Sequence, residues 1–320
     1  MLPYILLVGG FLLLIKGAGW FVDGASNIGA LLKISPLVIG LTIVAFGTGA
    51  PEATVSILAA LKGSADVAVG NVVGSNLINI TMVVGVTAII APITVKNQTI
   101  RKEIPFALLS AVALLIFMSD SYLEGTAVTS ISRSEGVTLL LFFTVFMYYI
   151  IEAARNNQDQ SYGPPPHDTS ASGWMKQIIL TAGGLAAIIF GGELVVRNAL
   201  EIAYRFGMSE TLAGLTIVAV GTALPEFATC ITAALKGKSE IAVGNIIGSN
   251  IFNTFFVIGL AAIILPLDVD ARMIVDVILM CVMTVVLLVF SRTRFAVGKY
   301  EGAILTAVYL IYLVYIIFRN

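Results

Sequence analysis

The sequence predicts an all-α polytopic membrane protein with about ten transmembrane helices in two inverted five-helix repeats. Three observations lead to this prediction. Hydrophobic residues make up 58% of the 320 residues and charged residues only 12%, a balance typical of membrane proteins. Apolar runs long enough to cross a bilayer recur along the whole chain. The stretch from Gly40 to Pro92 also recurs, without a gap, from Gly214 to Pro266.

The apolar runs give ten expected spans, each of about the length that bilayer thickness requires. The spans are residues 2–31, 36–61, 67–91, 103–119, 135–153, 174–204, 210–235, 241–265, 272–290 and 300–318. The first run begins without a basic segment or a small-residue cleavage site. We therefore interpret it as a retained helix and not as a signal peptide.

A polar segment divides the ten spans into two groups of five. Residues 155–173 are rich in Asn, Gln, Asp and Ser and include three consecutive prolines, a composition that cannot bury a core. We therefore expect a linker between a first repeat over residues 1–154 and a second over residues 174–320. Because five crossings are an odd number, the second repeat starts from the opposite side of the membrane, so the repeats are inverted.

The basic residues of the loops predict the orientation. One set of loops, which includes the linker, holds eleven Lys and Arg residues, and the other set holds six. The positive-inside rule places the richer set in the cytoplasm. The sequence thus predicts a multi-pass protein of the cell (plasma) membrane, with both termini extracellular and the central linker cytoplasmic.

The repeated stretch carries a carboxylate in the middle of an apolar span. The motif Gly47-Thr48-Gly49-Ala50-Pro51-Glu52 recurs as Gly221-Thr222-Ala223-Leu224-Pro225-Glu226, at an offset of 174 residues (226 − 52). A charged side chain at this depth is costly and usually functional. Proline cannot donate to the carbonyl four residues before it, so we expect each helix to break just ahead of its glutamate.

Oxygen atoms gather around each expected break. Thr48 and Thr222 stand one helical turn before the two glutamates. Downstream, Gly70 to Asn76 matches Gly244 to Asn250, and helical spacing puts Asn71, Ser75 and Asn79 of the first copy on one face. Asn245, Ser249 and Asn253 follow the same spacing in the second copy. Freed carbonyls at membrane depth also need a polar cavity, and oxygen ligands of this kind suit hard cations such as Na⁺ and Ca²⁺.

The remaining polar residues of the spans have other expected roles. Asn76 and Asn250 point off the ligand face, so we interpret them as interhelical hydrogen-bonding residues. Five further charges stand near the ends of spans, where we expect snorkelling or ion pairing. These charges are Lys16, Asp23, Glu193, Arg197 and Asp276.

Other readings of the two glutamates are possible. A glutamate in the first turn of a half-helix could simply complement the helix dipole, but that reading leaves the duplicated Asn and Ser partners unexplained. An intramembrane hydrolase would need two different environments for its acid and base, whereas these neighbourhoods are nearly identical and the single histidine, His167, lies in the linker. A passive channel fits less well, because inverted repeats around a midplane site favour alternating access.

The two motifs resemble those of sodium/calcium exchangers of the cation/calcium antiporter superfamily, prokaryotic type. In that family each repeat carries Gly-Thr-Ser-x-Pro-Glu/Asp followed by Gly-Asn-x-x-Gly-Ser-Asn. The resemblance implies a secondary active antiporter, not an enzyme, that exchanges Ca²⁺ for Na⁺ by alternating access. It implies no cofactor beyond these transported ions. It also implies no obligatory protein partner beyond the lipid bilayer. The net charge of −1 and the scattered basic residues argue against a nucleic-acid partner.

The resemblance also implies a ligand set. Glu52 and Glu226 would be the principal Ca²⁺ ligands, and Asn79 and Asn253 would complete the centre. The flanking oxygens would come from the hydroxyls of Thr48, Thr222, Ser75 and Ser249 and from the carbonyls of Ala45 and Ala219.

The sequence departs from the family pattern at several positions. Gly49 and Ala223 stand where relatives have Ser, so two hydroxyls that resemble Na⁺ ligands are absent. Asn253 stands where potassium-dependent relatives have Asp, which favours K⁺-independent exchange. Proton/calcium exchangers of the superfamily carry Gly-Asn-x-x-Glu, and this chain has Thr and Pro there. That difference favours sodium, and a Ca²⁺/H⁺ antiporter of the same fold remains the alternative.

Overall fold

The computed structural model describes residues 2–119, 129–156, 170–208 and 219–319. The first half holds α1 (Leu2–Leu32), α2 (Pro36–Ile39), η1 (Gly40–Val44), α3 (Ala45–Thr48), α4 (Ala50–Leu61), α5 (Ala65–Ile78), η2 (Asn79–Val83), α6 (Val84–Ile90), α7 (Asn97–Arg101), α8 (Glu103–Phe117) and α10 (Arg133–Asn156). The second half holds α11 (Ala171–Arg205), α13 (Ala219–Thr222), α14 (Leu224–Leu235), α15 (Ser239–Ile251), η4 (Phe252–Ile258), α16 (Gly259–Ile264), α17 (Met273–Arg294) and α18 (Lys299–Arg319). Segments labelled η are π-helical.

The helices confirm the all-α polytopic architecture. Among the described residues, seven helices are long and apolar enough to cross a membrane, or eight if the bent pair from Pro36 to Leu61 is one span. The expected span over 103–119 is α8, which has only 15 residues. The expected span over 210–235 is represented by α13 and α14, because residues 209–218 lie outside the described part. Each expected span therefore contains helix, although the count of ten is not confirmed exactly. The expected linker over 155–173 lies largely in residues 157–169, outside the described residues.

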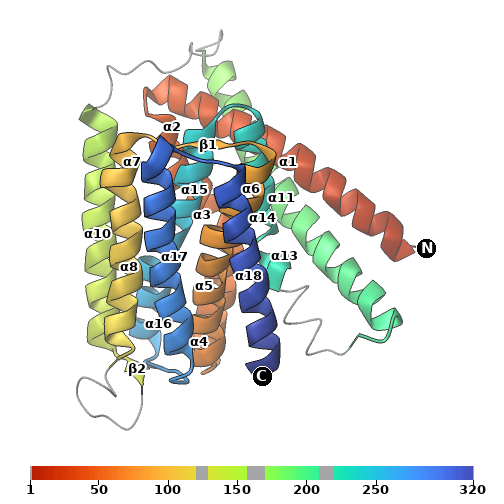
Figure 1. The fold of residues 1–320 in the computed structure, drawn as a ribbon. Coiled ribbons are helices and arrows are strands. Elements are labelled where there is room, and N and C mark those ends of the chain that lie inside the picture. The colour runs from red at the N-terminus through yellow and green to blue at the C-terminus, as the bar shows by residue number, and fades with distance from the viewer. Residues whose placement is uncertain (1, 120–128, 157–169, 209–218, 320) are drawn as a thin grey trace.

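Four short strands reveal how the two repeats are joined. Strand β1 (Ile93–Thr94) pairs antiparallel with β4 (Ala296–Val297), and β2 (Ser130–Ile131) pairs antiparallel with β3 (Leu267–Asp268). These two ribbons lie at opposite ends of the bundle (Figure 1), which we call the β1–β4 end and the β2–β3 end. The offset of 174 relates Ile93 to Leu267. The same inter-repeat contact therefore forms once at each end, as inverted repeats require.

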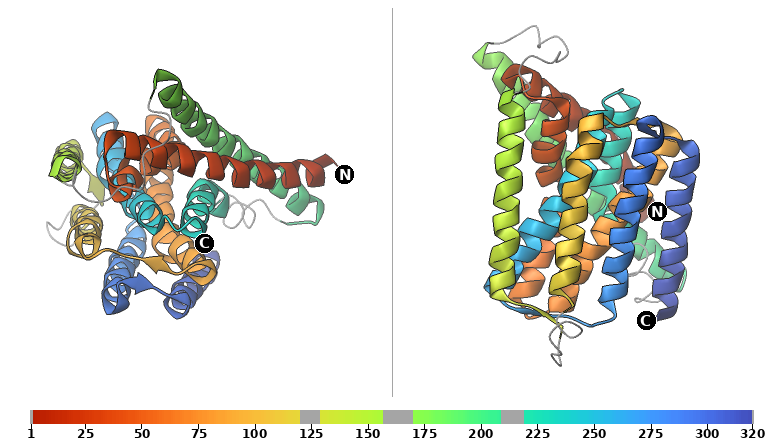
Figure 2. Two further views of the ribbon diagram at one scale, coloured as in Figure 1. Left: turned by 90° about the horizontal axis from the view of Figure 1, so that it is seen from above. Right: turned by 60° about the vertical axis from the view of Figure 1, so that its left-hand side comes forward.

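The first helix of each repeat pairs with the other along a seam of glycines. Helices α1 and α11 run obliquely together and extend to one side of the remaining helices (Figure 2). A Cβ atom at Gly10 would lie 3.0 Å from the carbonyl oxygen of Gly191, and one at Gly17 would lie 2.9 Å from that of Gly184. The two backbones can approach so closely only because these residues lack side chains. The pair also packs on the repeated motifs, since a Cβ atom at Gly47 would lie 3.1 Å from Phe21 of α1 and 3.2 Å from Leu185 of α11.

Candidate functional site

Each repeated motif forms a broken helix, as the sequence predicts. In the first copy the chain bends by 50° between the segment Pro36–Thr48 and helix α4. In the second copy α13 ends at Thr222 and α14 begins at Leu224. Pro51 and Pro225 occupy the first turn of the new helix in each case. The missing proline N–H explains why the chain cannot continue as one straight helix.

The two glutamates lie deep inside the molecule and near each other. Glu52 and Glu226 are each only 1% exposed. Their carboxyl groups are close enough for the two charges to repel. Within the described residues no group of three or more His, Cys, Asp or Glu side chains gathers. Any cation held here would therefore need hydroxyl, amide and carbonyl oxygens to complete its coordination.

Four buried oxygen atoms around these carboxylates have no hydrogen-bond partner within the described structure. They are Oε2 of Glu52 and Glu226 and Oδ1 of Asn79 and Asn253. The offset of 174 relates the four residues as two equivalent pairs. A buried acceptor without a partner costs about 1–3 kcal/mol, and such groups are rare in native structures. These four atoms can therefore bind a cation, since each of them is an oxygen acceptor without a partner.

A symmetric set of amide hydrogen bonds fixes the direction of the two inner asparagines. Asn79 Nδ2 donates to Asn250 Oδ1 at 3.2 Å, and Asn253 Nδ2 donates to Asn76 Oδ1 at 3.3 Å. Asn76 and Asn250 also donate to each other's backbone carbonyls, at 3.4 and 3.3 Å. The expected interhelical role of Asn76 and Asn250 is confirmed. These bonds also occupy the amide nitrogens of Asn79 and Asn253, which leaves their oxygens unpartnered.

Sequence reasoning missed the π-helical geometry of these asparagines. Asn79 is the first residue of η2, and Asn253 is the second residue of η4. A π-turn shifts the direction of the side chains that follow it and is common at functional sites. The apolar residues around both positions have the same pattern in an α-turn and in a π-turn, so no sequence signal distinguished the two.

Hydroxyl groups at equivalent positions of the two copies have different surroundings. Thr48 is buried and donates to Asn245 Oδ1 at 3.0 Å. Ser249 donates to the carbonyl of Ala45 at 3.4 Å, and that carbonyl also accepts from Gly49 N at 2.9 Å. In contrast, Thr222 and Ser75 line a cavity. Ala219 begins α13 directly after the residues that are not described.

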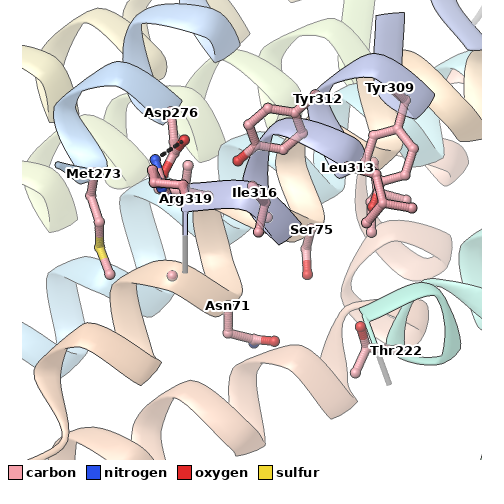
Figure 3. Close-up of a pocket in the computed structure, with 14 residues that line it drawn as sticks. Asn71, Ser75, Thr222, Met273, Asp276, Tyr309, Tyr312, Leu313, Ile316 and Arg319 are labelled. Carbon is pink, nitrogen blue, oxygen red and sulfur yellow. Dashed lines mark hydrogen bonds and ion pairs between the residues drawn. The ribbon is translucent and has the colours of Figure 1, made fainter. Parts of the chain in front are cut away.

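This cavity has a volume of about 280 Å³ and connects the first copy of the motif with helices α17 and α18. We call it the α5–α18 cavity. Figure 3 shows Asn71 and Ser75 of α5 and Thr222 of α13 on one part of its wall, and Asp276 and Arg319 on another. The cavity lies at the β2–β3 end, because Arg319 also donates to the carbonyl of Arg272, shortly after β3. The four residues that carry the unpartnered oxygens are not among those that line the cavity.

Two of the span-end charges form the ion pairs that the sequence suggested as one option. Asp23 binds Lys236 at 2.6 Å and Lys238 at 3.2 Å. Asp276 binds Arg319 at 2.8 Å. The partner of Asp276 was missed, because the two residues are far apart in sequence and only the packing of α18 on the site brings them together.

Comparisons with known proteins agree with this architecture. A family model described as "Sodium/calcium exchanger protein" matches residues 2–152 and 176–318. The chain is 39% identical over 312 residues to the putative antiporter CaxA of Alkalimonas amylolytica, covering 95% of each chain. It is 30% identical to the sodium/calcium exchanger MaX1 of Methanosarcina acetivorans, covering 97% of each.

A solved structure is similar over the same extent. The sodium-calcium exchanger NCX_Mj, from crystals soaked with Na⁺ and Sr²⁺, superposes with a TM-score of 0.83 at 28% identity, covering 98% of both chains. Together with the family match over both repeats, these similarities show that the chain belongs to the sodium/calcium exchanger family, prokaryotic type, and is a multi-pass Ca²⁺ antiporter rather than an enzyme.

Proposed function

We propose that the protein exchanges Ca²⁺ for Na⁺ by alternating access, without K⁺, and that both ions bind at the centre formed by Glu52 and Glu226. The observation that carries this proposal is the set of four buried, unpartnered oxygens on Glu52, Glu226, Asn79 and Asn253. The two carboxylates supply a charge of −2, which one Ca²⁺ would neutralise. Without a cation this charge would be costly in a low-dielectric interior.

The remaining ligands of the proposed centre come from the residues beside these oxygens. They are the hydroxyls of Thr48, Thr222, Ser75 and Ser249 and the carbonyls of Ala45 and Ala219. Oxygen ligands of mixed charge suit Ca²⁺ and Na⁺. The contacts of Thr48 and Ser249 described above bond them to the opposite repeat. Binding of an ion there would require these hydroxyls to exchange one partner for another.

Unequal access to the two copies of the motif supports alternating access. Asn71 of α5 lies beside the α5–α18 cavity, whereas its counterpart Asn245 is completely buried. Inverted repeats can exchange these two environments by a symmetric rearrangement. The present arrangement is then one of two, with the centre reachable from the β2–β3 end.

We also propose the orientation and the division of the chain. Residues 1–154 and 174–320 would form the repeats, with the linker 155–173 in the cytoplasm and both termini outside the cell membrane. The excess of basic residues in the loops with the linker supports this orientation. A Ser161→Cys label in intact cells should react with impermeant reagents only after the membrane is opened. Labelling from outside would reverse the orientation.

The coupling ion is tested by imposing one gradient at a time. In proteoliposomes a Na⁺ gradient should drive uptake of radiolabelled Ca²⁺, a pH gradient of equal magnitude should not, and K⁺ should have no effect. The alternative is Ca²⁺/H⁺ exchange, for which the Gly49 and Ala223 positions, without hydroxyls, are the favouring observation. Uptake driven by the pH gradient without Na⁺ would establish that alternative.

A further inference from the structure

An ion pair stands in the wall of the α5–α18 cavity, outside the proposed ion-binding centre. Asp276 is in the first turn of α17, and Arg319 is in the last turn of α18. The guanidinium binds the carboxylate through two parallel hydrogen bonds, Nη1 to Oδ1 at 2.8 Å and Nη2 to Oδ2 at 2.9 Å (Figure 3). The two side chains are largely buried, at 18% exposure for Arg319 and 7% for Asp276.

The position of this pair relates it to the route of an ion. The same cavity is lined by Asn71, Ser75 and Thr222, which belong to the two repeated motifs. A cation that approaches the centre through this cavity therefore passes both the carboxylate and the guanidinium. Because the surroundings are partly shielded from water, the charges of the pair act on the passing ion more strongly than surface charges would.

The corresponding place in the first repeat holds a buried carboxylate without an arginine bound to it in the described structure. Glu103 stands in the first turn of α8, is buried, and accepts a hydrogen bond from the hydroxyl of Tyr149 in α10. Helices α8 and α10 correspond by order to α17 and α18. Thr99 and the charge of Lys102 also act on Glu103, but no arginine binds it among the described residues, and Tyr312 lies beside Asp276 in the second repeat as well. Arg319 adds a full positive charge to the carboxylate that faces the cavity.

We propose that the carboxylate of Asp276 binds cations transiently on their way to the centre, and that the guanidinium of Arg319 competes with these cations for the carboxylate. Together they set the apparent Ca²⁺ affinity on the β2–β3 side only. With Arg319 in place, both carboxylate oxygens are occupied and the pair has no net charge, so Ca²⁺ passes without being held. Conduction past a carboxylate requires binding that is weak enough for the ion to leave. The inference rests on the proposed route of Ca²⁺ through this cavity and not on the identity of the coupling ion.

The test uses Ca²⁺/Ca²⁺ self-exchange by the full-length protein in right-side-out and inside-out vesicles. Arg319→Gln should lower the half-saturating Ca²⁺ concentration about three- to tenfold on one face only, because it exposes the carboxylate. Asp276→Asn should raise it by a similar factor on that face, because it leaves the guanidinium unpaired. The double variant should lie close to wild type. On the opposite face all three should match wild type.

Matched variants control for folding. Arg319→Lys keeps the charge but cannot form two parallel bonds. It should therefore lower the half-saturating Ca²⁺ concentration as Arg319→Gln does, by a smaller factor. This variant replaces Arg319→Gln in the test if Arg319→Gln does not fold. The Lys96–Glu240 pair, 2.9 Å apart near the β1–β4 end, provides a control. Lys96→Gln should not change the affinity measured at the face where Arg319→Gln acts.

Several results would overturn the proposal. They are unchanged affinity in both single variants, shifts in the same direction for both, or equal shifts on both faces. Failure of the sodium-coupling proposal would be seen separately, because it would abolish Na⁺-driven uptake in the wild type while leaving self-exchange measurable. If Glu52 is not part of the ion-binding centre, Glu52→Gln should show normal self-exchange. That result is independent of the variants at Asp276 and Arg319.

Discussion

The small-residue faces of α5 and α15 have nearly the same sequence and quite different surroundings. A Cβ atom at Gly244 of α15 would lie 2.7 Å from the carbonyl oxygen of Leu37 and 2.9 Å from the Cα atom of Gly40. A Cβ atom at the equivalent Gly70 of α5 would meet only the flexible end of Met273, at 3.5 Å, and one at Gly74 would meet nothing within 4 Å. One copy of the motif seals the bundle, and the other borders a cavity.

One duplicated motif thus occupies two different environments in the same chain. The glycines of α15 allow the backbone of α2 and η1 to approach, which closes the β1–β4 end. Those of α5 are free of such contacts at the β2–β3 end. The same glycines occur in both copies. This identity fits a protein in which each copy is closely packed in one arrangement and borders a cavity in the other.

The largest effect is expected at Glu52 and Glu226, which occupy equivalent positions in the two repeats and are equally buried. Glu52→Gln and Glu226→Gln should each reduce Ca²⁺ transport by about tenfold or more, because each removes half of the charge that would hold Ca²⁺. Uptake of radiolabelled Ca²⁺ by purified, well-folded protein measures the loss. Glu201→Gln, at an exposed ion pair with Arg205, is the control. Near wild-type uptake in either site variant would contradict the assignment.

The two glycine faces can be compared directly by adding one methyl group to each. Gly244→Ala should destabilise the protein by about 1–3 kcal/mol, because the new Cβ would overlap with backbone that cannot move aside. Gly74→Ala should leave the melting temperature unchanged but slow transport, if α5 closes in the other arrangement. Melting curves and transport rates on the same preparations separate the two effects. Equal destabilisation by both changes would show that the described asymmetry is absent in the membrane.

A smaller effect is expected where hydroxyls are missing from both copies. The double change Gly49→Ser with Ala223→Ser should raise the apparent Na⁺ affinity more than the Ca²⁺ affinity, since Ca²⁺ depends more on the two carboxylates. A Cβ at Gly49 would lie 3.0 Å from the carbonyl of Ala45, so a slight backbone shift is required. Gly49→Ala is the steric control, and titration of Na⁺-dependent Ca²⁺ uptake measures the difference. Unchanged sodium dependence would mean that backbone or water already fills those positions.

The smallest effect is expected where the two copies differ by one atom. Cys230 corresponds to Ser56, and each accepts from an asparagine amide, Asn245 at 3.2 Å and Asn71 at 2.9 Å. Cys230→Ser keeps an acceptor at the same place, so transport should change by no more than about twofold. Cys230→Ala, which removes the acceptor from a buried amide, should have the larger effect. A tenfold loss in the serine variant would assign the sulfur a role of its own.

Much of the site was predictable from local sequence. The breaks at Pro51 and Pro225 follow from chemistry within one helical turn, and the role of Asn76 follows from helical spacing. The Asp276–Arg319 pair was not predictable, because it depends on how two helices dock. The unequal exposure of Asn71 and Asn245 was not predictable either, since the two sequences are alike and only the arrangement as a whole breaks the symmetry.

The two ribbons at the ends of the bundle bear on how such a chain could have arisen by gene duplication. Each ribbon takes one strand from each half, so a single half would present β1 and β2 without partners. Two copies of one half, inserted in opposite directions, would supply each other's missing strands, and an ancestor of half the length would then have worked as an antiparallel homodimer. Fusion of two such genes needs a connection that starts and ends on the same side of the membrane, where the present chain has its polar central segment.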